Sequence, residues 1–505
     1  MPPPYYPSSL ELAESCEPPV FVGPSDLGSS SVDSGDFMLT EIFLAQAAQF
    51  GFFLNTDRFR KSVLRQSSSS DTTSPSKALI SVASLWGVHL SEAQSSTSSR
   101  EAEFLRRALT YTGMQMTSDL ASAQILELIQ AKVLLGTYFL RRNRPQDSDY
   151  HIDGAVSLCL AAGLHRLDFT SSDSCQPPGS QQSALSGPVK DLIDEGERLT
   201  GFWTVFALQR HSLIARHPTS SGFGNLESCQ EITSPWPPRM EDSKLLATES
   251  LGTLKDMWSH ATCFASTSDG CSEREMYVKA MILLQKAVYY LSRAELTSQP
   301  DYYATIYHGC VALSDTISDF QLSLPSHVSL AREYSLTPET DSVKRQSIQL
   351  LIITHSIASC AQLKVHQLMK SCGLTDITPH TCIDVALGVL QSHYRLCSSG
   401  CAALDPVAST LCSIAYEYLL QEQAKTESES VGLYWLGRDL GLAVEAGPGG
   451  ANQPPERHAR ILVAVEESRS IMTYLSTACP CINHQFERLS KLYDAHLPKS
   501  LVYQA

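Results

Sequence analysis

The 505-residue sequence lacks any long uninterrupted apolar run. A membrane helix needs about 20 consecutive, mostly apolar residues. The longest apolar stretches, 126–140 and 347–360, are interrupted by Lys132 and His355. No basic residue precedes Arg58, so the start of the chain also lacks the pattern of a secretory signal. We therefore expect a soluble, intracellular protein with no membrane partner.

Basic residues are in short supply. The chain has 38 Lys and Arg residues against 53 Asp and Glu residues, which gives a formal net charge of −15. The average field around such a molecule repels phosphate. Because nucleic-acid affinity depends largely on phosphate contacts from basic side chains, unaided binding to DNA is disfavoured.

Cysteines are present, but the spacing of a structural zinc site is missing. Cys397 and Cys401 are four positions apart, and Cys479 and Cys481 are two apart and are followed by His484. Neither group has the Cys-x-x-Cys spacing typical of such sites. The 15 cysteines are otherwise scattered through apolar segments, which indicates small buried side chains in a reducing compartment. We expect no metal site formed by these residues.

Catalytic motifs are missing as well. The sequence has no His-Glu-x-x-His and no Gly-x-Ser-x-Gly, and the glycines at 447–450 lack the strand and lysine of a phosphate-binding loop. An acidic cluster is better explained as a solvated helix start, where carboxylates complement the helix dipole, than as a metal or acid–base site. Its members are Asp191, Asp194, Glu195 and Glu197. We predict no enzyme and no bound cofactor.

Helical periodicity is abundant. In 197–213 the apolar residues recur at three- and four-residue spacing, as expected for an amphipathic helix with an aromatic face. No run alternates convincingly enough to predict a strand. The fold class is therefore all-α, a multi-helix bundle built from antiparallel helix pairs. Further helices are expected at 125–139, 276–294, 302–320, 347–369, 382–394, 407–424 and 457–478.

Composition divides the chain into parts. Residues 1–36 form an acidic leader rich in Pro and Ser, which we expect to be disordered because it can bury little apolar surface. A first helical domain covers 37–240. Residues 241–505 form a C-terminal helical region packed on the first, or part of the same domain. Loops are expected at 67–76, 95–99, 170–188 and 446–455.

The stretch DGAVSLCLAAGLHRL, residues 153–167, has the features of a helix end. Gly163 can adopt the left-handed conformation that stops a helix, and Leu164 can fold back as the accompanying apolar contact. His165 and Arg166 would then bond the last free carbonyls and complement the dipole. This interpretation is favoured over a catalytic pair, because no nucleophile or carboxylate partner is identifiable nearby.

Four sequence segments occur in a characteristic order. They are Phe50 to Leu54 with Arg58 and Phe59, a helix at 124–140, the stretch 155–166, and finally a helix with an acid, an arginine and Phe-Trp. This order resembles the regulatory "middle homology" domain of fungus-specific transcription factors, and it covers about 37–240. The residues that match the two family motifs are Gly163, Leu164, His165 and Arg166, then Glu197, Arg198, Phe202 and Trp203.

The resemblance implies a transcription regulator module that acts on RNA polymerase II transcription in the nucleus. It implies structural roles for the eight motif residues, and partners in the transcription machinery; the chain could also form a homodimer. In the family, zinc is held by a six-cysteine cluster that contacts DNA. Only Cys16 lies in the first 150 residues, so DNA would be reached through a partner or through a module missing from this sequence.

Two other classes of protein stay open. One is a non-catalytic α-helical scaffold for protein interactions, which would have long apolar grooves and no closed bundle. The other is an all-α enzyme acting on a hydrophobic small molecule, which would need polar groups that converge in a pocket.

Overall fold

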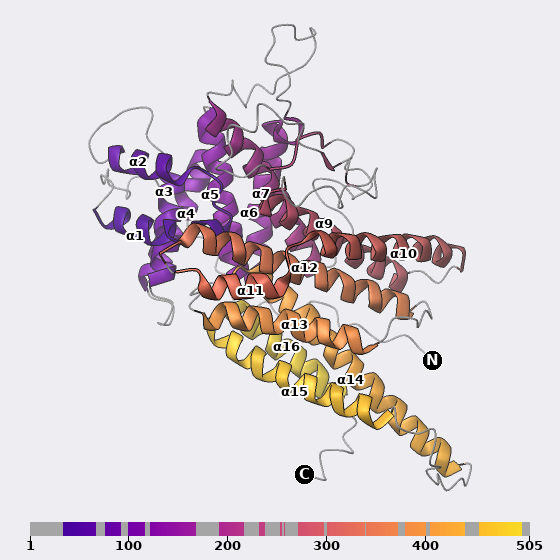
Figure 1. Ribbon diagram of the computed structural model, residues 1–505. Coiled ribbons are helices and arrows are strands. Elements are labelled where there is room, and N and C mark those ends of the chain that lie inside the picture. The colour runs from indigo at the N-terminus through magenta and orange to yellow at the C-terminus, as the bar shows by residue number, and fades with distance from the viewer. Residues whose placement is uncertain are drawn as a thin grey trace.

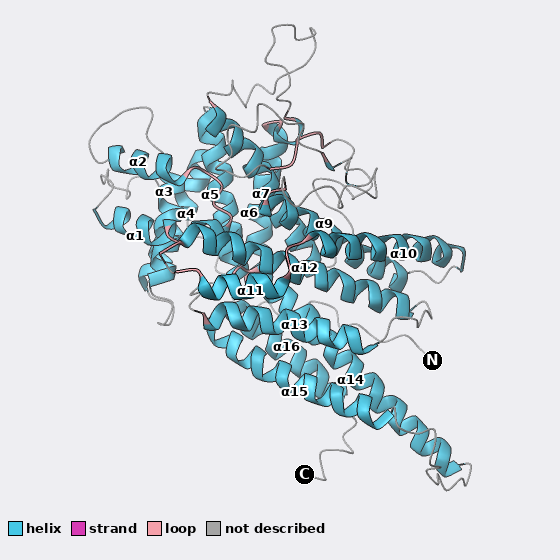
Figure 2. Cartoon of the chain, in the orientation of Figure 1, coloured by secondary structure: helices cyan, strands magenta, loops and turns pink. Residues whose placement is uncertain are grey.

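The computed structural model confirms the all-α class. It describes residues 34–66, 76–91, 99–116, 122–167, 191–216, 232–237, 253–254, 257, 271–296, 300–338, 340–371, 379–399, 404–439 and 454–496. Of these residues 88% are helical and 1% are in strand conformation (Figure 2). The extended part is an isolated bridge between Pro235 and Thr253.

The first half of the chain contributes α1 (Ser34–Leu44), α2 (Thr56–Gln66), α3 (Lys77–Ser91), α4 (Ser99–Met116), α5 (Ser122–Arg141), α6 (Pro145–Ala161) and α7 (Leu192–Arg216), with short 3-10 turns η2 (Ala47–Phe50) and η3 (Leu164–Arg166). The second half contributes α9 (Glu273–Leu296), α10 (Pro300–Ser323), α11 (His327–Leu336), α12 (Ser342–Ser371), α13 (Pro379–Ser398), α14 (Val407–Asp439), α15 (Pro454–Ala478) and α16 (Pro480–His496).

Every helix predicted from periodicity is present, and most extend several residues beyond the predicted ends. The predicted leader falls outside the described residues up to residue 33, and α1 begins at Ser34. The predicted loops at 67–76, 95–99, 170–188 and 446–455 lie wholly or mostly outside the described residues.

Helix α3 lies at the centre of the N-terminal half. All residues from Ala78 to His89 are buried, and α1, α4 and α5 pack on this helix. A helix that is apolar on all sides shows no amphipathic stripe, so periodicity did not predict it. Gly87 permits the close approach of α1, because a Cβ atom there would lie 2.2 Å from the carbonyl oxygen of Leu39.

Helices α5 and α6 form a tight pair joined by three residues. Pro145 opens α6, a position that needs no backbone N–H. The Ser148 hydroxyl donates to the Gly136 carbonyl at 2.8 Å, and the rings of Phe139 and His151 stack. Antiparallel pairs as the general unit of the bundle stay a prediction.

The two halves share one hydrophobic core. Helix α7 packs on α9, α9 packs along α12, and α12 packs on α13, which continues to α15 and α16 (Figure 1). A single cluster of buried apolar residues extends from Phe43 to Leu489. The helices after residue 270 therefore complete the core that the first helices begin.

Helix α12 also passes a length and hydropathy test for a membrane span, over Val343–Ser371. Within the fold, 78% of its most apolar window is buried by other helices. Because the core helix of a globular fold meets the same criteria, this segment is accounted for by its packing against α9, α10 and α13.

Candidate functional site

The predicted helix stop at Gly163 is confirmed. Helix α6 ends at Ala161, and Gly163 has φ 70° and ψ 17°, in the left-handed region. Its N–H donates to the Leu160 carbonyl at 3.0 Å, and Leu164 is buried. The turn then continues as η3, so His165 and Arg166 lie in a short 3-10 helix.

The backbone of this turn binds a segment that the sequence did not single out, residues 232–237. The His165 carbonyl accepts the N–H groups of Thr233 and Ser234 at 3.0 and 3.3 Å. The Ser234 hydroxyl donates to the Leu164 carbonyl at 2.7 Å and accepts the Leu167 N–H at 2.9 Å. The predicted bonding of the His165 and Arg166 side chains to free carbonyls stays a prediction.

The second motif meets the same segment. Trp203 on α7 donates its indole N–H to the Pro235 carbonyl at 2.6 Å. Its ring stacks on Trp236, with ring centres 4.5 Å apart and an interplanar angle of 25°. Phe202 is fully buried beside it. Residues 232–237 therefore join the two motifs, although the motifs are far apart along the chain.

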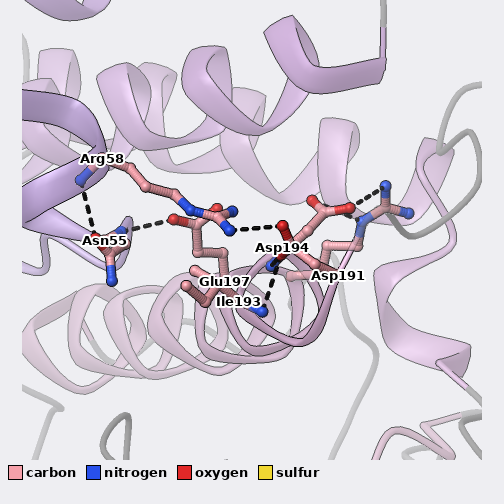
Figure 3. Close-up of polar contacts among 7 residues, drawn as sticks. Asn55, Arg58, Asp191, Ile193, Asp194 and Glu197 are labelled. Atoms are coloured by element: carbon pink, nitrogen blue, oxygen red, sulfur yellow. Dashed lines mark hydrogen bonds and ion pairs between the residues drawn. The ribbon is translucent and has the colours of Figure 1, made fainter. Parts of the chain in front are cut away.

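Glu197 is buried, so the predicted solvated start of its helix is wrong at this residue. Asp191 does cap α7, because its Oδ1 accepts the N–H groups of Ile193 and Asp194, and Arg58 donates to its Oδ2 at 2.6 Å (Figure 3). Glu197, however, is only 8% exposed and accepts the N–H of Asn55 at 2.7 Å.

Burial raises the pKa of Glu197, and the Asn55 N–H opposes this shift. Arg198, also buried, pairs with Asp194 one turn earlier at 3.1 Å. The periodicity rule missed this arrangement because the partner of Glu197 is the backbone of a distant loop. The acid and the arginine of the motif are thus held by different neighbours.

The loop that holds Asn55 is fastened to α5 by one amide side chain. Gln130 Oε1 accepts the N–H groups of Phe53 and Leu54 at 2.6 and 3.3 Å, and its Nε2 donates to the Gly51 carbonyl at 3.1 Å. Gln130 is fully buried. A polar side chain within the largely apolar run of α5 was the available signal, because a buried amide must find partners.

A buried network links α3, α4 and α5 to the beginning of α14. Glu101 Oε1 accepts the Tyr138 hydroxyl at 2.8 Å and lies 2.9 Å from His89 Nδ1. Arg141 donates to His89 Nε2 at 3.0 Å and to the Leu404 carbonyl at 2.9 Å. Because Arg141 occupies Nε2, the neutral ring carries its proton on Nδ1 and donates to Glu101.

The pKa directions agree with this network. Burial lowers the pKa of His89, which stays neutral. Burial acts to raise the pKa of Glu101, but hydrogen bonds from His89 and Tyr138 outweigh it, and the pKa lies below the ordinary value. The network is thus an ionised carboxylate held by two neutral donors and, at 3.9 Å, by the Arg142 guanidinium, with Arg141 bridging to the second half of the chain.

A cavity lies where the two halves meet. It holds about 770 Å³ of empty space, part of it open to solvent, and residues of η2, α5, α7, α9, α12 and the start of α14 line it. Its polar wall includes Arg274, Tyr277 and Asp405. None of these three was a candidate site residue on sequence grounds, because Asp405 lies more than 120 positions beyond Arg274 and Tyr277.

Metal-binding groups are absent from the described residues, where no cluster of three or more His, Cys, Asp or Glu side chains is placed to hold an ion. This part of the chain does not fit the family's zinc cluster. The nine described cysteines are free, and seven are buried, as predicted. Cys481 is one of these, and burial raises the pKa of its thiol to about 11.

The comparison with known proteins agrees with the order of the motifs. Residues 42–264 match the family model of the fungal specific transcription factor domain, and the match contains all eight motif residues. No curated protein and no solved structure matches the chain. The family is generally non-catalytic, and the match supports a regulatory role in transcription. Residues 42–264 of this chain are therefore similar to the fungal specific transcription factor domain, as the resemblance of the two motifs predicted.

Proposed function

We propose that this chain is the regulatory module of a fungal zinc-cluster transcription factor that controls RNA polymerase II transcription from the nucleus. The observation that carries the proposal is the family match over 42–264, within which both motifs converge on residues 232–237. The module acts through protein partners in the transcription machinery. A homodimer of the chain is one form in which it could do so.

DNA contact is supplied by another module or by a partner. The net charge of −15 disfavours phosphate binding by the chain itself. The described residues also offer no site for the family's zinc cluster. The chain's contribution is therefore to receive a signal and pass it on, rather than to read base sequence.

A compact module is favoured over the scaffold alternative. A scaffold of stacked helix pairs would bury each helix only against its neighbours. Here α3 is enclosed on all sides, and one core extends through both halves. Such a closed body suits a domain with a defined interior better than an extended docking platform.

The enzyme alternative is supported by one observation, the four ionisable groups that line the cavity, His211, Arg274, Tyr277 and Asp405. We infer binding without turnover there. The threonines of the same wall, Thr137 and Thr204, donate their hydroxyls to carbonyls of their own helices at 2.9 and 2.8 Å. They are thereby unavailable as activated nucleophiles, which need a neighbouring base.

The proposal is tested in the fungus by tagging and deleting the gene. The tagged full chain should accumulate in the nucleus and crosslink to a defined set of promoters. Deletion should change the transcripts of those genes. Exclusion from the nucleus together with unchanged transcripts would contradict the proposed role.

A second experiment separates regulation from DNA contact. The purified full chain should give no tight, sequence-specific shift with promoter fragments. Fused to a heterologous DNA-binding domain, it should alter a reporter. Glu101→Ala, which breaks the buried network, should remove this effect, and Glu103→Ala, on the exposed side of α4, should preserve it. A specific shift by the chain alone would show that the DNA contact is its own.

A further inference from the structure

The cavity between the two halves has an apolar interior and a polar mouth. Phe50, Val133, Trp203 and Val278 contribute to the interior wall. A second hollow, of about 1450 Å³ and also partly open, adjoins it and shares with it Arg274, Asp405 and three other residues. Charged and polar residues of α9 and α12 line this outer hollow. Arg274 and Asp405 therefore line both hollows, where the largely apolar one adjoins the more polar one.

Arg274 is a partly buried cation that forms no ion pair with a described carboxylate, although the charge of the neighbouring Glu273 acts on it. It makes no hydrogen bond or ion pair with any described residue, and burial lowers the pKa of its guanidinium. Other enclosed arginines of this chain are partnered: Arg141 donates to His89, and Arg198 pairs with Asp194. Because partial burial makes a charge without a direct partner costly, Arg274 is a position where an anion bound in the cavity would be stabilised.

Asp405 is a partly buried anion that also has no ion pair with a described residue. One of its oxygens accepts the Val407 N–H at 2.9 Å at the start of α14, and no described cation pairs with the carboxylate. The phenol of Tyr277 lies close enough for the charge of Asp405 to contribute to raising its pKa. Arg274 does not contribute to the pKa shift of Asp405, so the two charges do not neutralise each other.

The chain around Asp405 is held in place from both sides. The Leu404 carbonyl accepts a hydrogen bond from Arg141, and the Thr410 hydroxyl bonds His211 Nε2 at 2.9 Å. Both partners belong to helices of the 42–264 domain. Asp405 is thus presented to the cavity by a fixed backbone, which lowers the entropy that a ligand would have to offset.

From this arrangement we propose that the cavity binds a zwitterionic small molecule of amino-acid or dipeptide size that carries an apolar group. Its carboxylate is held by Arg274, its ammonium group by Asp405, and its apolar group by the inner chamber beside Trp203. A zwitterion supplies one counter-charge to each unpaired group and adds no net charge to the enclosed site. This inference rests on the proposed function, because we interpret the cavity as the place where the regulatory module binds an effector.

The test is titration calorimetry with the full chain and four probes. Phenylalanine and phenylalanylglycine carry both charges and an apolar ring, hydrocinnamate lacks the ammonium group, and phenethylamine lacks the carboxylate. At least one zwitterion should bind with a dissociation constant of about 1 mM or below. Both single-charge probes should bind at least about tenfold more weakly, because each leaves one buried charge unpaired.

Two variants and a control locate the site. Arg274→Met and Asp405→Asn should each lower the affinity by about tenfold or more. Asn retains an oxygen for the Val407 N–H, so α14 keeps its cap. Lys344→Met removes a cation from the outer hollow, where Lys344 already pairs with Glu333 at 2.8 Å, and should leave the affinity unchanged.

The outcomes separate this site from the proposed function. Absence of zwitterion binding, hydrocinnamate binding as tightly as phenylalanine, or variants that bind like the wild type would each overturn the site. None of these results would affect the nuclear, promoter and transcript measurements. Thermal unfolding of each variant comes first, and we expect both site variants to be folded and at least as stable as the wild type.

Discussion

Two buried polar regions of this protein differ in how far their groups are satisfied. Around Glu101, on α3, α4 and α5, the charged and polar atoms bond one another or a backbone carbonyl. At the cavity, Arg274 and Asp405 are partly buried and have no ion pair with a described residue. The charged groups of the first region have their partners within the chain. The two charges at the cavity would gain ion-pair partners from a bound ligand.

The difference teaches how to separate structural from functional charge in a helical bundle. A buried group whose partners are present stabilises the fold, and removing it leaves those partners unsatisfied. A buried group without partners costs stability, so it persists where binding compensates for it. Arg141 and Arg274 should therefore respond oppositely to the same substitution.

The largest effect is expected for Arg141→Met. Methionine cannot donate to His89 or to the Leu404 carbonyl, and both would be left unsatisfied inside the protein. The free energy of unfolding should fall by about 2 to 5 kcal/mol, because each buried acceptor left unsatisfied costs about 1 to 3 kcal/mol. Urea denaturation followed by circular dichroism measures this change.

Arg274→Met is the matched comparison. It removes a desolvated cation and no hydrogen bond to a described residue, so the free energy of unfolding should rise by about 1 kcal/mol. A loss of stability similar to that of Arg141→Met would show that Arg274 is structural, and the contrast between the two regions would fail.

The pH dependence of stability probes the other unpaired charge. Burial raises the pKa of Asp405 to about 6, above the value near 4 of an unfolded chain. The folded state then holds this proton more tightly, so the contribution of Asp405 is most favourable below pH 4 and is lost as pH rises to about 6. Two pKa units correspond to about 3 kcal/mol.

Asp405→Asn isolates this contribution from all other titrations. The variant should match the wild type near pH 4 and exceed it in unfolding free energy by up to about 3 kcal/mol at pH 7. Arg274, Tyr277 and His211 share the cavity wall; burial lowers the pKa of His211 to about 4, so it stays neutral over most of this window. A difference that is constant with pH would contradict a raised pKa at Asp405.

Glu197 is an intermediate case, a buried carboxylate with one backbone partner. Glu197→Ala leaves the Asn55 N–H without its acceptor and should cost about 2 kcal/mol. Glu197→Gln keeps an acceptor and removes a charge whose pKa burial has raised, so its effect should stay within about 1 kcal/mol. Chemical denaturation of both variants at pH 7 measures the two losses in the free energy of unfolding. Equal losses in the two variants would contradict this ranking.

Much of the fold was predictable because amphipathic helices carry their period in the sequence. The helices at 197–213 and 407–424 were found in this way and lie within α7 and α14. Helix α3 was not, because it is buried on all sides and therefore has no polar face to set the period. The family resemblance was predictable from the two motifs in order, and the match over 42–264 confirms it.

The cavity could not be predicted. Arg274 and Asp405 are 131 positions apart, and each reads as an ordinary charged residue next to a helix. That neither forms an ion pair with a described residue is a property of packing, which no local sequence pattern records. The burial of Glu197 was missed for the same reason, since its partner Asn55 comes from a loop 142 positions away.

The smallest expected effect concerns Gly163, the glycine of the first motif, where a substitution changes the backbone strain and not a charge. Gly163 has a positive φ of 70°, so Gly163→Ala should cost about 1 kcal/mol through backbone strain. Gly388 lies inside α13 with open space around its Cβ position, and Gly388→Ala should stabilise by about 0.5 to 1 kcal/mol. Because neither glycine lines the cavity, neither change should alter the affinity for phenylalanine. Thermal unfolding and calorimetry of the two variants check both statements, and a loss of binding in Gly163→Ala alone would mean that the motif's turn also shapes the cavity.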